Sequence, residues 1–119
     1  MARHNEFGKK GEELASGWLS EKGFSILHRN WRQGHEEIDI IALRGGIYHF
    51  IEVKCSVGTM YGYPEERVSK SKLRSMMRVA SHWLYTNHIL ANKRVQYDVL
   101  AITFNEGPPV FTLFEDISL

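Results

Sequence analysis

Residues 37–54 read EIDIIALRGGIYHFIEVK, and this stretch decides the fold. Two runs of alternating side chains, residues 37–43 and 47–54, flank the pair Gly45-Gly46. Because glycine adopts positive φ without strain, this pair suits a two-residue primed turn. Apolar residues occur on both faces of the two runs, which predicts a central hairpin covered on both sides.

The turn also predicts which residues of the hairpin lie opposite one another. Counting outward from it, Asp39 faces Glu52, and Lys54 follows on the same face. Directly opposed residues have Cβ atoms roughly 4.5–5.5 Å apart, so two carboxylates there repel unless a cation lies between them. Mg²⁺ is the natural candidate, and Lys54 would orient a water or stabilise charge on a phosphate. The alternative is a structural ion pair on a solvated sheet face, and a register slip of one residue would separate the groups.

Residues 6–22 have the periodicity of an amphipathic helix that ends at Gly23. Its apolar stripe consists of Phe7, Leu14, Ala15, Trp18 and Leu19. Glu12 lies at the border of this stripe, about 100° from its centre, whereas Glu13 points away. We therefore expect Glu12 to reach the acidic site as a third carboxylate. Compensation of the helix dipole is the alternative role for Glu12.

The remaining segments predict a mixed α/β fold. We expect a short strand over residues 24–29, a loop over 30–36 except for Trp31, and a second loop over 58–66. A second helix runs from an N-cap at Ser69 to about residue 87, and strands follow over 95–104 and 110–114, the last at an edge. The second helix should bury Leu73, Met76, Met77, Ala80, Trp83 and Leu84. The order α-β-β-β-α-β-β predicts a mixed central sheet flanked by helices, with one helix crossover, in a single domain over 1–119.

The second helix begins within a basic run that contains no acidic residue. Its members are Arg67, Lys70, Lys72, Arg74 and Arg78. A helix N-terminus also favours phosphate, so we expect this segment to bind a nucleic-acid backbone, with Arg29, Arg32 and Lys9-Lys10 extending the track. Lys72 borders the buried stripe and is expected to reach the acidic site. The alternative is a solvated charged face.

Composition limits the class of protein. The 119 residues contain 15 Lys and Arg against 14 Asp and Glu, a formal net charge of +1, which excludes a polycation that coats nucleic acid by charge alone. A single cysteine, Cys55, excludes an internal disulfide. The charged N-terminus lacks the apolar region of a signal peptide, so we expect a cytoplasmic protein without a membrane partner. The segment His35 to Asp39 does not match the zinc motif His-Glu-x-x-His.

Four segments in order resemble the YraN-like family of small bacterial proteins: residues 8–15 (GKKGEELA), 27–32 (LHRNWR), 37–42 (EIDIIA) and 50–54 (FIEVK). Lys72 and the strand Tyr97-Asp98-Val99 also match the family pattern. That family is similar to archaeal-type Holliday-junction resolvases in the restriction-endonuclease-like, PD-(D/E)xK, superfamily. The resemblance implies that Asp39 and Glu52 are metal ligands, Lys54 is the catalytic lysine and Glu12 is an accessory acid. This chain departs from the family at Glu36, where glycine is usual, and at Cys55-Ser56, where an arginine is common.

The resemblance implies a restriction-endonuclease-like core and an Mg²⁺-dependent endonuclease, with Mn²⁺ as a substitute, that acts on branched or structured DNA. A homodimer is expected for a small domain that cuts a two-stranded substrate. The competing expectation is a non-catalytic module with the same fold, either for nucleic-acid binding or for assembly through a sheet edge, because a fold does not by itself fix a function.

Overall fold

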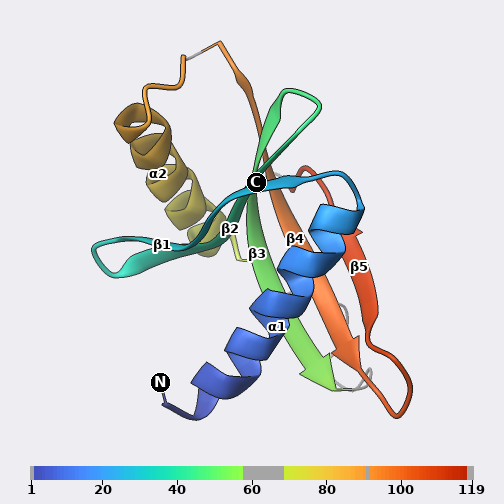
Figure 1. The fold of residues 1–119 in the computed structure, drawn as a ribbon. Coiled ribbons are helices and arrows are strands. Elements are labelled where there is room, and N and C mark those ends of the chain that lie inside the picture. Colours follow the sequence, from blue (N-terminus) through green and yellow to red (C-terminus); the bar gives the residue numbers. More distant parts are fainter. Residues whose placement is uncertain (1, 58–68, 91, 118–119) are drawn as a thin grey trace.

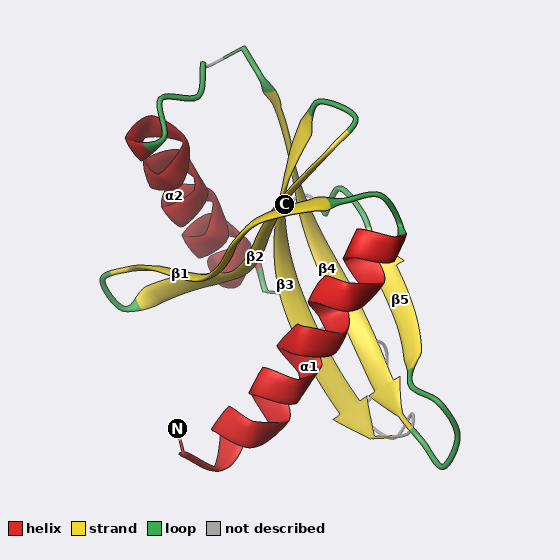
Figure 2. Cartoon of the chain, in the orientation of Figure 1, coloured by secondary structure: helices red, strands yellow, loops and turns green. Residues whose placement is uncertain are grey.

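The computed structural model describes residues 2–57, 69–90 and 92–117. These residues form two helices and one five-stranded sheet (Figures 1 and 2). The elements in chain order are α1 (Ala2–Glu21), β1 (Ser25–Gln33), β2 (Glu36–Arg44), β3 (Ile47–Val57), α2 (Lys70–Thr86), β4 (Arg94–Phe104) and β5 (Val110–Phe114). This is the predicted order of helices and strands, and the predicted α/β class with a mixed sheet flanked by helices is confirmed.

The sheet has the strand order β1-β2-β3-β4-β5. All neighbouring strands are antiparallel except β3 and β4, which are parallel and are joined through α2. A parallel pair needs such a crossover because its strands run in the same direction. Strand β5 lies at one edge, as predicted, and β1 lies at the other edge.

Two apolar clusters cover the two faces of the central strands. One cluster lies under α1 and contains Ala15, Leu19, Phe24, Ile40, Ala42, Ile51, Leu100 and Ile102. The other lies under α2 and contains Ile38, Ile41, Phe50, Met76, Val79, Ala80 and Trp83. The helices therefore lie on opposite faces of the sheet, as the apolar residues on both faces of the hairpin predicted (Figure 1).

Local signals define the ends of several elements as predicted. Gly45 and Gly46 have φ values of 59° and 76°, which the two-residue turn requires. Gly23 has a φ of 94°, and the N–H of Phe24 donates to the carbonyl of Leu19, a C-terminal cap of the Schellman type. At the start of α2 the Ser69 hydroxyl accepts the N–H of Lys72 at 3.0 Å.

Two details of the sequence prediction are wrong. Of the predicted loop 30–36, residues 34–35 form the turn between β1 and β2, whereas the rest is strand, because β1 continues to Gln33 and β2 begins at Glu36. Strand β1 lies at the sheet edge and is mostly exposed, so no alternating apolar pattern marks it. In α2 the buried stripe includes Val79, whereas Met77 is 38% exposed, since the helix packs on a slightly rotated face. The predicted loop 58–66 and Arg67 lie outside the described residues.

Among the described residues, no helix is both long enough and apolar enough to span a membrane.

A candidate acidic site between the two helices

Asp39 lies where β2 separates from β3. The paired residues of the two strands run from Arg44 and Ile47 to Ile40 and Ile51, in the predicted register. At the next position the Asp39 carboxylate, rather than the backbone, accepts the N–H of Val53 at 2.8 Å. Asp39 and Glu52 were expected to be a directly opposed pair of the β2–β3 ladder. The observed pairing ends one position earlier, at Ile40 and Ile51, and a bond from the Val53 N–H to the Asp39 side chain links the strands instead.

The side chains of β2 also stop alternating at Asp39. Ile38 packs in the cluster under α2, although two-residue alternation would place it beside Ile40 in the cluster under α1. Ile41 lies under α2 as well. The strand thus twists at Asp39, which turns this carboxylate toward the gap between the strands.

Glu52 is the buried carboxylate of the site, with 9% of the residue exposed. The Lys54 ammonium lies 3.6 Å from its Oε2, and the Lys72 ammonium lies 3.5 Å from its Oε1. Lys54 comes from the same strand, and Lys72 comes from the first turn of α2. Each oxygen of Glu52 therefore faces a positive charge from a different element, and the expectation that Lys72 reaches the acidic site agrees with this geometry.

Helix α1 approaches β3 closely just before Glu12. Gly11 is buried, and a Cβ atom at this position would overlap the Cys55 sulfur. A side chain at position 11 would force the Cys55 side chain, the helix or the strand to shift. The next residue, Glu12, is partly buried, whereas Glu13 is exposed, which agrees with the helical-wheel prediction.

The ionisation of Asp39 shows that the three acids interact. Burial raises the pKa of the Asp39 carboxyl well above its ordinary value, and the charges of Glu52 and Glu12 raise it further, while the bond from Val53 N–H opposes the shift. Burial and the charges of Asp39 and Glu12 likewise raise the pKa of the Cys55 thiol to about 11. Asp39, Glu52 and Glu12 are thus close enough to oppose one another's charge, and Cys55 stays a neutral thiol beside them.

These acids do not form the most compact group of possible metal ligands. Among the described residues, the ligand atoms of His49, Asp98 and Glu115 are the ones that lie within 4.8 Å of one another. His49 Nδ1 and Asp98 Oδ2 are 2.6 Å apart and buried, and Asp98 Oδ1 accepts the N–H of Asp116 at 2.9 Å. Glu115 lies 3.4 Å from Arg44.

Asp98 therefore satisfies a buried histidine and anchors the backbone after β5, and these contacts give it a structural role. The sequence pattern assigns no role to His49 and marks Asp98 only as part of the strand Tyr97-Asp98-Val99. One feature of the sequence indicates that Asp98 has such contacts: it is an acidic residue inside the apolar run of β4, and a buried carboxylate needs hydrogen-bond or ionic partners.

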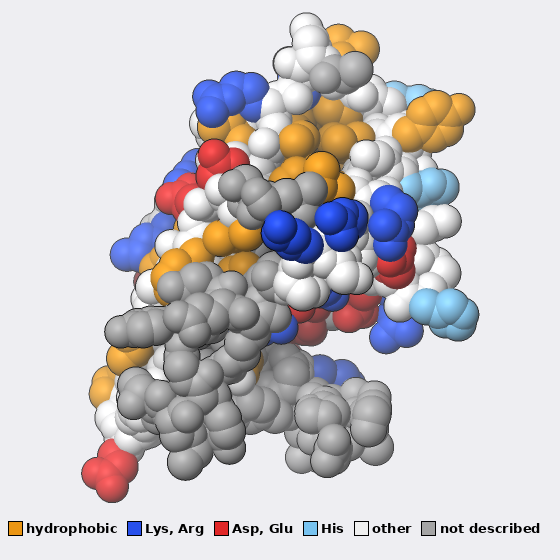
Figure 3. Space-filling model, turned by 180° about the vertical axis from the view of Figure 1, so that it is seen from behind, with side chains coloured by type: hydrophobic (Ala, Val, Ile, Leu, Met, Phe, Trp, Pro, Cys, Tyr) orange, Lys and Arg blue, Asp and Glu red, His pale blue; other side chains and the backbone are white. Residues whose placement is uncertain are grey.

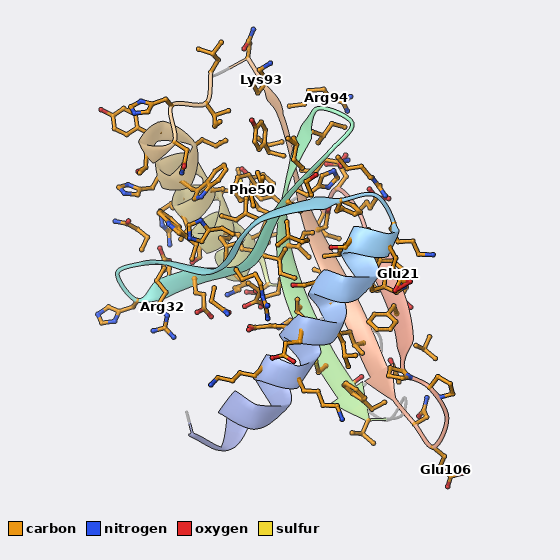
Figure 4. The ribbon with its side chains drawn as sticks, viewed as in Figure 1. Glu21, Arg32, Phe50, Lys93, Arg94 and Glu106 are labelled. Atoms are coloured by element: carbon orange, nitrogen blue, oxygen red, sulfur yellow. The ribbon has the colours of Figure 1, made fainter. Side chains whose placement is uncertain are left out.

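The predicted nucleic-acid-binding residues lie on two elements. Arg29 and Arg32 are exposed on β1, and Arg32 lies near the tip of the β1–β2 hairpin, while Phe50 marks the centre of the sheet between the helices (Figure 4). Lys70, Arg74 and Arg78 are exposed on α2, and Lys72 is partly buried. Seen from behind, Lys and Arg side chains form a row on one face, and His side chains lie beyond it (Figure 3).

Two of these arginines are paired with glutamates of the hairpin. Arg32 Nε lies 3.1 Å from Glu37, and an Arg78 nitrogen lies 2.8 Å from Glu36. Glu36 also accepts the hydroxyl proton of Ser75, and these two bonds lower the pKa of its carboxyl. Glu36 thus joins the hairpin to α2.

Comparison with known proteins gives a family. The family model described as "Uncharacterised protein family UPF0102" matches residues 11–102. A UPF0102 protein of Phocaeicola vulgatus is 40% identical over 108 residues, which is 91% of this chain and 88% of that protein. A UPF0102 protein of Rhodococcus opacus is 41% identical over 108 residues, which is 91% of each chain. The matched region includes α1 from Gly11, the acidic site and α2.

Proposed function

The chain belongs to the uncharacterised protein family UPF0102, and we propose that it is a metal-dependent nuclease that hydrolyses phosphodiester bonds of DNA. The proposal follows the resemblance to restriction-endonuclease-like proteins and includes branched or structured DNA among its substrates. One observation supports it most: Asp39, held by the N–H of Val53 at 2.8 Å, lies near the buried Glu52, and burial raises the pKa of its carboxyl well above the ordinary value, with the charges of Glu52 and Glu12 raising it further. A group of neighbouring carboxylates that repel one another and have perturbed pKa values is typical of functional sites.

A hard divalent cation fits this donor set. Asp39, Glu52 and Glu12 offer carboxylate oxygens only, which Mg²⁺ and Mn²⁺ prefer, whereas the neutral Cys55 thiol beside them does not favour these ions. Burial raises the pKa of Asp39 most, and a cation between the carboxylates would offset the repulsion by Glu52 and Glu12 that adds to this shift. When bound, Mg²⁺ would polarise a phosphate oxygen and lower the pKa of a water molecule.

The lysines supply the remaining chemistry of the proposed site. Lys54 lies beside Glu52 on the same strand and would orient the attacking water or stabilise the negative charge that develops on the phosphate. Lys72 faces the other oxygen of Glu52 and fixes the orientation of that carboxylate. Glu12, carried by α1, would hold a second cation or a water.

The exposed cations of α2 suit the DNA backbone. Lys70 and Arg74 make no ion pair with another described residue, whereas Arg78 is paired with Glu36. Arg29 on β1 is exposed as well. These groups would position the phosphates by charge without reading sequence.

Cleavage of linear, flapped and four-way DNA with Mg²⁺ or Mn²⁺ tests the proposal. We expect the wild type to cleave at least one of these substrates, and Asp39→Ala or Lys54→Ala to lower the rate by at least about 100-fold. Glu12→Ala should lower it too, and Glu13→Ala, one residue further and exposed, is the matched control. Activity that is absent from the wild type, or that persists in both Asp39→Ala and Lys54→Ala, would refute the catalytic assignment.

A second candidate is a non-catalytic nucleic-acid-binding or assembly module. It is favoured by the ion pairs of Glu52, since Lys54 and Lys72 already compensate this carboxylate without a metal. DNA binding with no metal-dependent cleavage would support this candidate. Calorimetric titration with Mg²⁺ or Mn²⁺, in wild type and Asp39→Asn, separates a metal site from a purely structural ion pair.

A further inference from the structure

Three aromatic rings from two elements meet on the α2 side of the sheet. His28 and Trp31 come from β1, and their ring centroids are 6.5 Å apart in an edge arrangement. His82 comes from α2, and its ring lies 5.8 Å from that of Trp31. Both histidines are exposed, while Trp31 is partly buried against the cluster under α2. We call these three residues the aromatic cluster; it presents ring surfaces to solvent from a fixed base.

A row of cations along α2 leads to this cluster. Lys70, Arg74, Arg78 and His82 are spaced four residues apart, and residues at that spacing are neighbours on one helix face. All four are exposed. The cations of this row are Lys70, Arg74 and Arg78, of which Arg78 is paired with Glu36, and the next position, His82, belongs to the aromatic cluster. Figure 3 shows Lys and Arg side chains gathered on one face, with His side chains beyond them. Groups that suit phosphates thus adjoin rings that suit planar ligands.

The β1–β2 hairpin and α2 connect the aromatic cluster to the candidate acidic site. Trp31 pairs with Ile38 across the β1–β2 hairpin, and Ile38 directly precedes Asp39. Lys72, which lies on the same helix as His82, reaches Glu52 at 3.5 Å. A nucleic-acid strand that follows α2 would therefore pass Lys72, which contacts Glu52, and then His82 of the aromatic cluster.

We propose that this surface binds an unpaired segment of nucleic acid, with a base stacked on the aromatic cluster and phosphates along the cation row. The proposal rests on the proposed function for the chemistry of the candidate acidic site. Cations alone bind single strands and duplexes alike, whereas bases inside a duplex are stacked on each other and offer no free ring face. Exposed rings beside a row of cations are typical of single-strand binding.

Binding in EDTA tests the proposal without cleavage. The probes are a fluorescent oligo-dT strand of about 20 nucleotides and a blunt mixed-sequence duplex of the same length, which exceed the usual single-strand site sizes. The exposed histidines allow His28→Ala and His82→Ala without disturbing the core. Each should weaken binding of the single strand by roughly 5- to 100-fold, the usual effect of losing one stacking partner, and change duplex binding by less than about twofold.

Two control variants separate stacking from charge. Arg74→Gln removes a cation from the row and should weaken the single strand and the duplex by similar factors. His88→Asn changes an exposed histidine outside the cluster, at a positive φ of 57° that asparagine tolerates, and should change neither. Equal losses for both DNA forms in His82→Ala would overturn the proposal, because they would indicate a contact to phosphate alone.

Tryptophan fluorescence gives a second, independent readout. Trp18 lies on the other face of the sheet, where it stacks on Phe111, and Trp83 is buried. Of the three tryptophans, Trp31 is therefore the one whose emission would report on the aromatic cluster. The single strand should quench the wild-type emission, and Trp31→Phe should abolish most of this quenching. Quenching that survives in Trp31→Phe would overturn the proposal.

These outcomes are distinct from those for the proposed function. Selective single-strand binding at the aromatic cluster, without cleavage in Mg²⁺ or Mn²⁺, would refute the nuclease and leave this inference standing. Metal-dependent cleavage with unchanged single-strand affinity in both His28→Ala and His82→Ala would refute the inference and leave the nuclease standing. Binding of neither DNA form would overturn the inference as well and would indicate a protein partner for this face.

Discussion

Because α1 approaches β3 closely at Gly11, we predict that a glycine-to-alanine substitution in α1 changes the free energy of unfolding in opposite directions at Gly11 and at Gly17. Gly11 and Gly17 both lie in α1, and an added Cβ at Gly17 meets nothing within 4 Å, whereas at Gly11 it overlaps the sulfur of Cys55. In an unobstructed helix, alanine is more favourable than glycine by about 1 kcal/mol. Gly17→Ala should therefore raise the free energy of unfolding by about that amount.

At Gly11 the same gain is opposed by overpacking. Inserting a methyl group into a filled space costs typically about 1–3 kcal/mol, because the helix or the strand must shift. Gly11→Ala should therefore change the free energy of unfolding by between roughly zero and 2 kcal/mol in the destabilising direction. For a chain of this size, 1 kcal/mol corresponds to a Tm shift of roughly 4 °C.

Removal of the sulfur tests the cause. In a Cys55→Ala background the overlap disappears, so Gly11→Ala should become stabilising by about 1 kcal/mol, like Gly17→Ala. Urea unfolding of the four proteins in the Gly11/Cys55 cycle should give a coupling energy of about 1–3 kcal/mol. A value near zero for the Gly17/Cys55 cycle is the control.

The position of Glu12 gives the same cycle a functional readout. If α1 shifts outward in Gly11→Ala, Glu12 moves away from Asp39, and the metal affinity and cleavage rate should fall together and recover in Gly11→Ala/Cys55→Ala. Stabilisation by Gly11→Ala in the wild-type background, equal to that of Gly17→Ala, would refute the close packing of α1 on β3.

Three further predictions concern single carboxylates. Because the pKa of Asp39 is raised in the folded protein, the folded state holds this proton more tightly than the unfolded state, and the metal-free protein should lose stability as pH rises above the ordinary value of 3.8. Asp39→Asn, which keeps an acceptor for Val53, should remove that loss in urea unfolding at pH 5 and 8 and abolish stabilisation by Mg²⁺. Glu36→Gln should free Arg78, so that DNA affinity, measured against salt, gains about one phosphate contact, a slope steeper by roughly 0.9. Asp98→Ala should lower the free energy of unfolding by about 1–3 kcal/mol in urea unfolding, since the His49 ring and the N–H of Asp116 would lose their acceptor; an unchanged free energy of unfolding would contradict this.

The parts of the fold that sequence predicted well depend on local signals. The hairpin around Gly45-Gly46 follows from turn chemistry and alternation, and both ends of α2 follow from Ser69 and the apolar stripe. The extension of β1 to Gln33 could not be predicted in the same way. An edge strand exposed on most positions has no buried face, so alternation is not imposed on its side chains.

The candidate site likewise has parts that local periodicity predicts and parts that it does not. The register brought Asp39 near Glu52, and the helical wheel brought Glu12 toward both, because each argument uses a fixed period. The twist of β2 at Asp39 occurs where its carboxylate binds the N–H of Val53, and the pairing of Arg78 with Glu36 joins residues 42 positions apart. Neither leaves a periodic trace in the sequence, since both depend on how separate elements pack.

The net charge of +1 conceals an uneven distribution of charge that bears on the binding of a polyanion. Arg32 and Arg78 are compensated by Glu37 and Glu36, so the free cations of the surface are fewer than the sequence predicted. At the acidic site, Glu12, Asp39 and Glu52 formally exceed the two lysines beside them by one negative charge. A divalent cation would reverse that sign, next to the exposed Lys70 and Arg74. On this reasoning the metal would not only serve hydrolysis; it would also change a site that repels phosphate into one that attracts it, so affinity for DNA and occupancy of the acidic site are coupled.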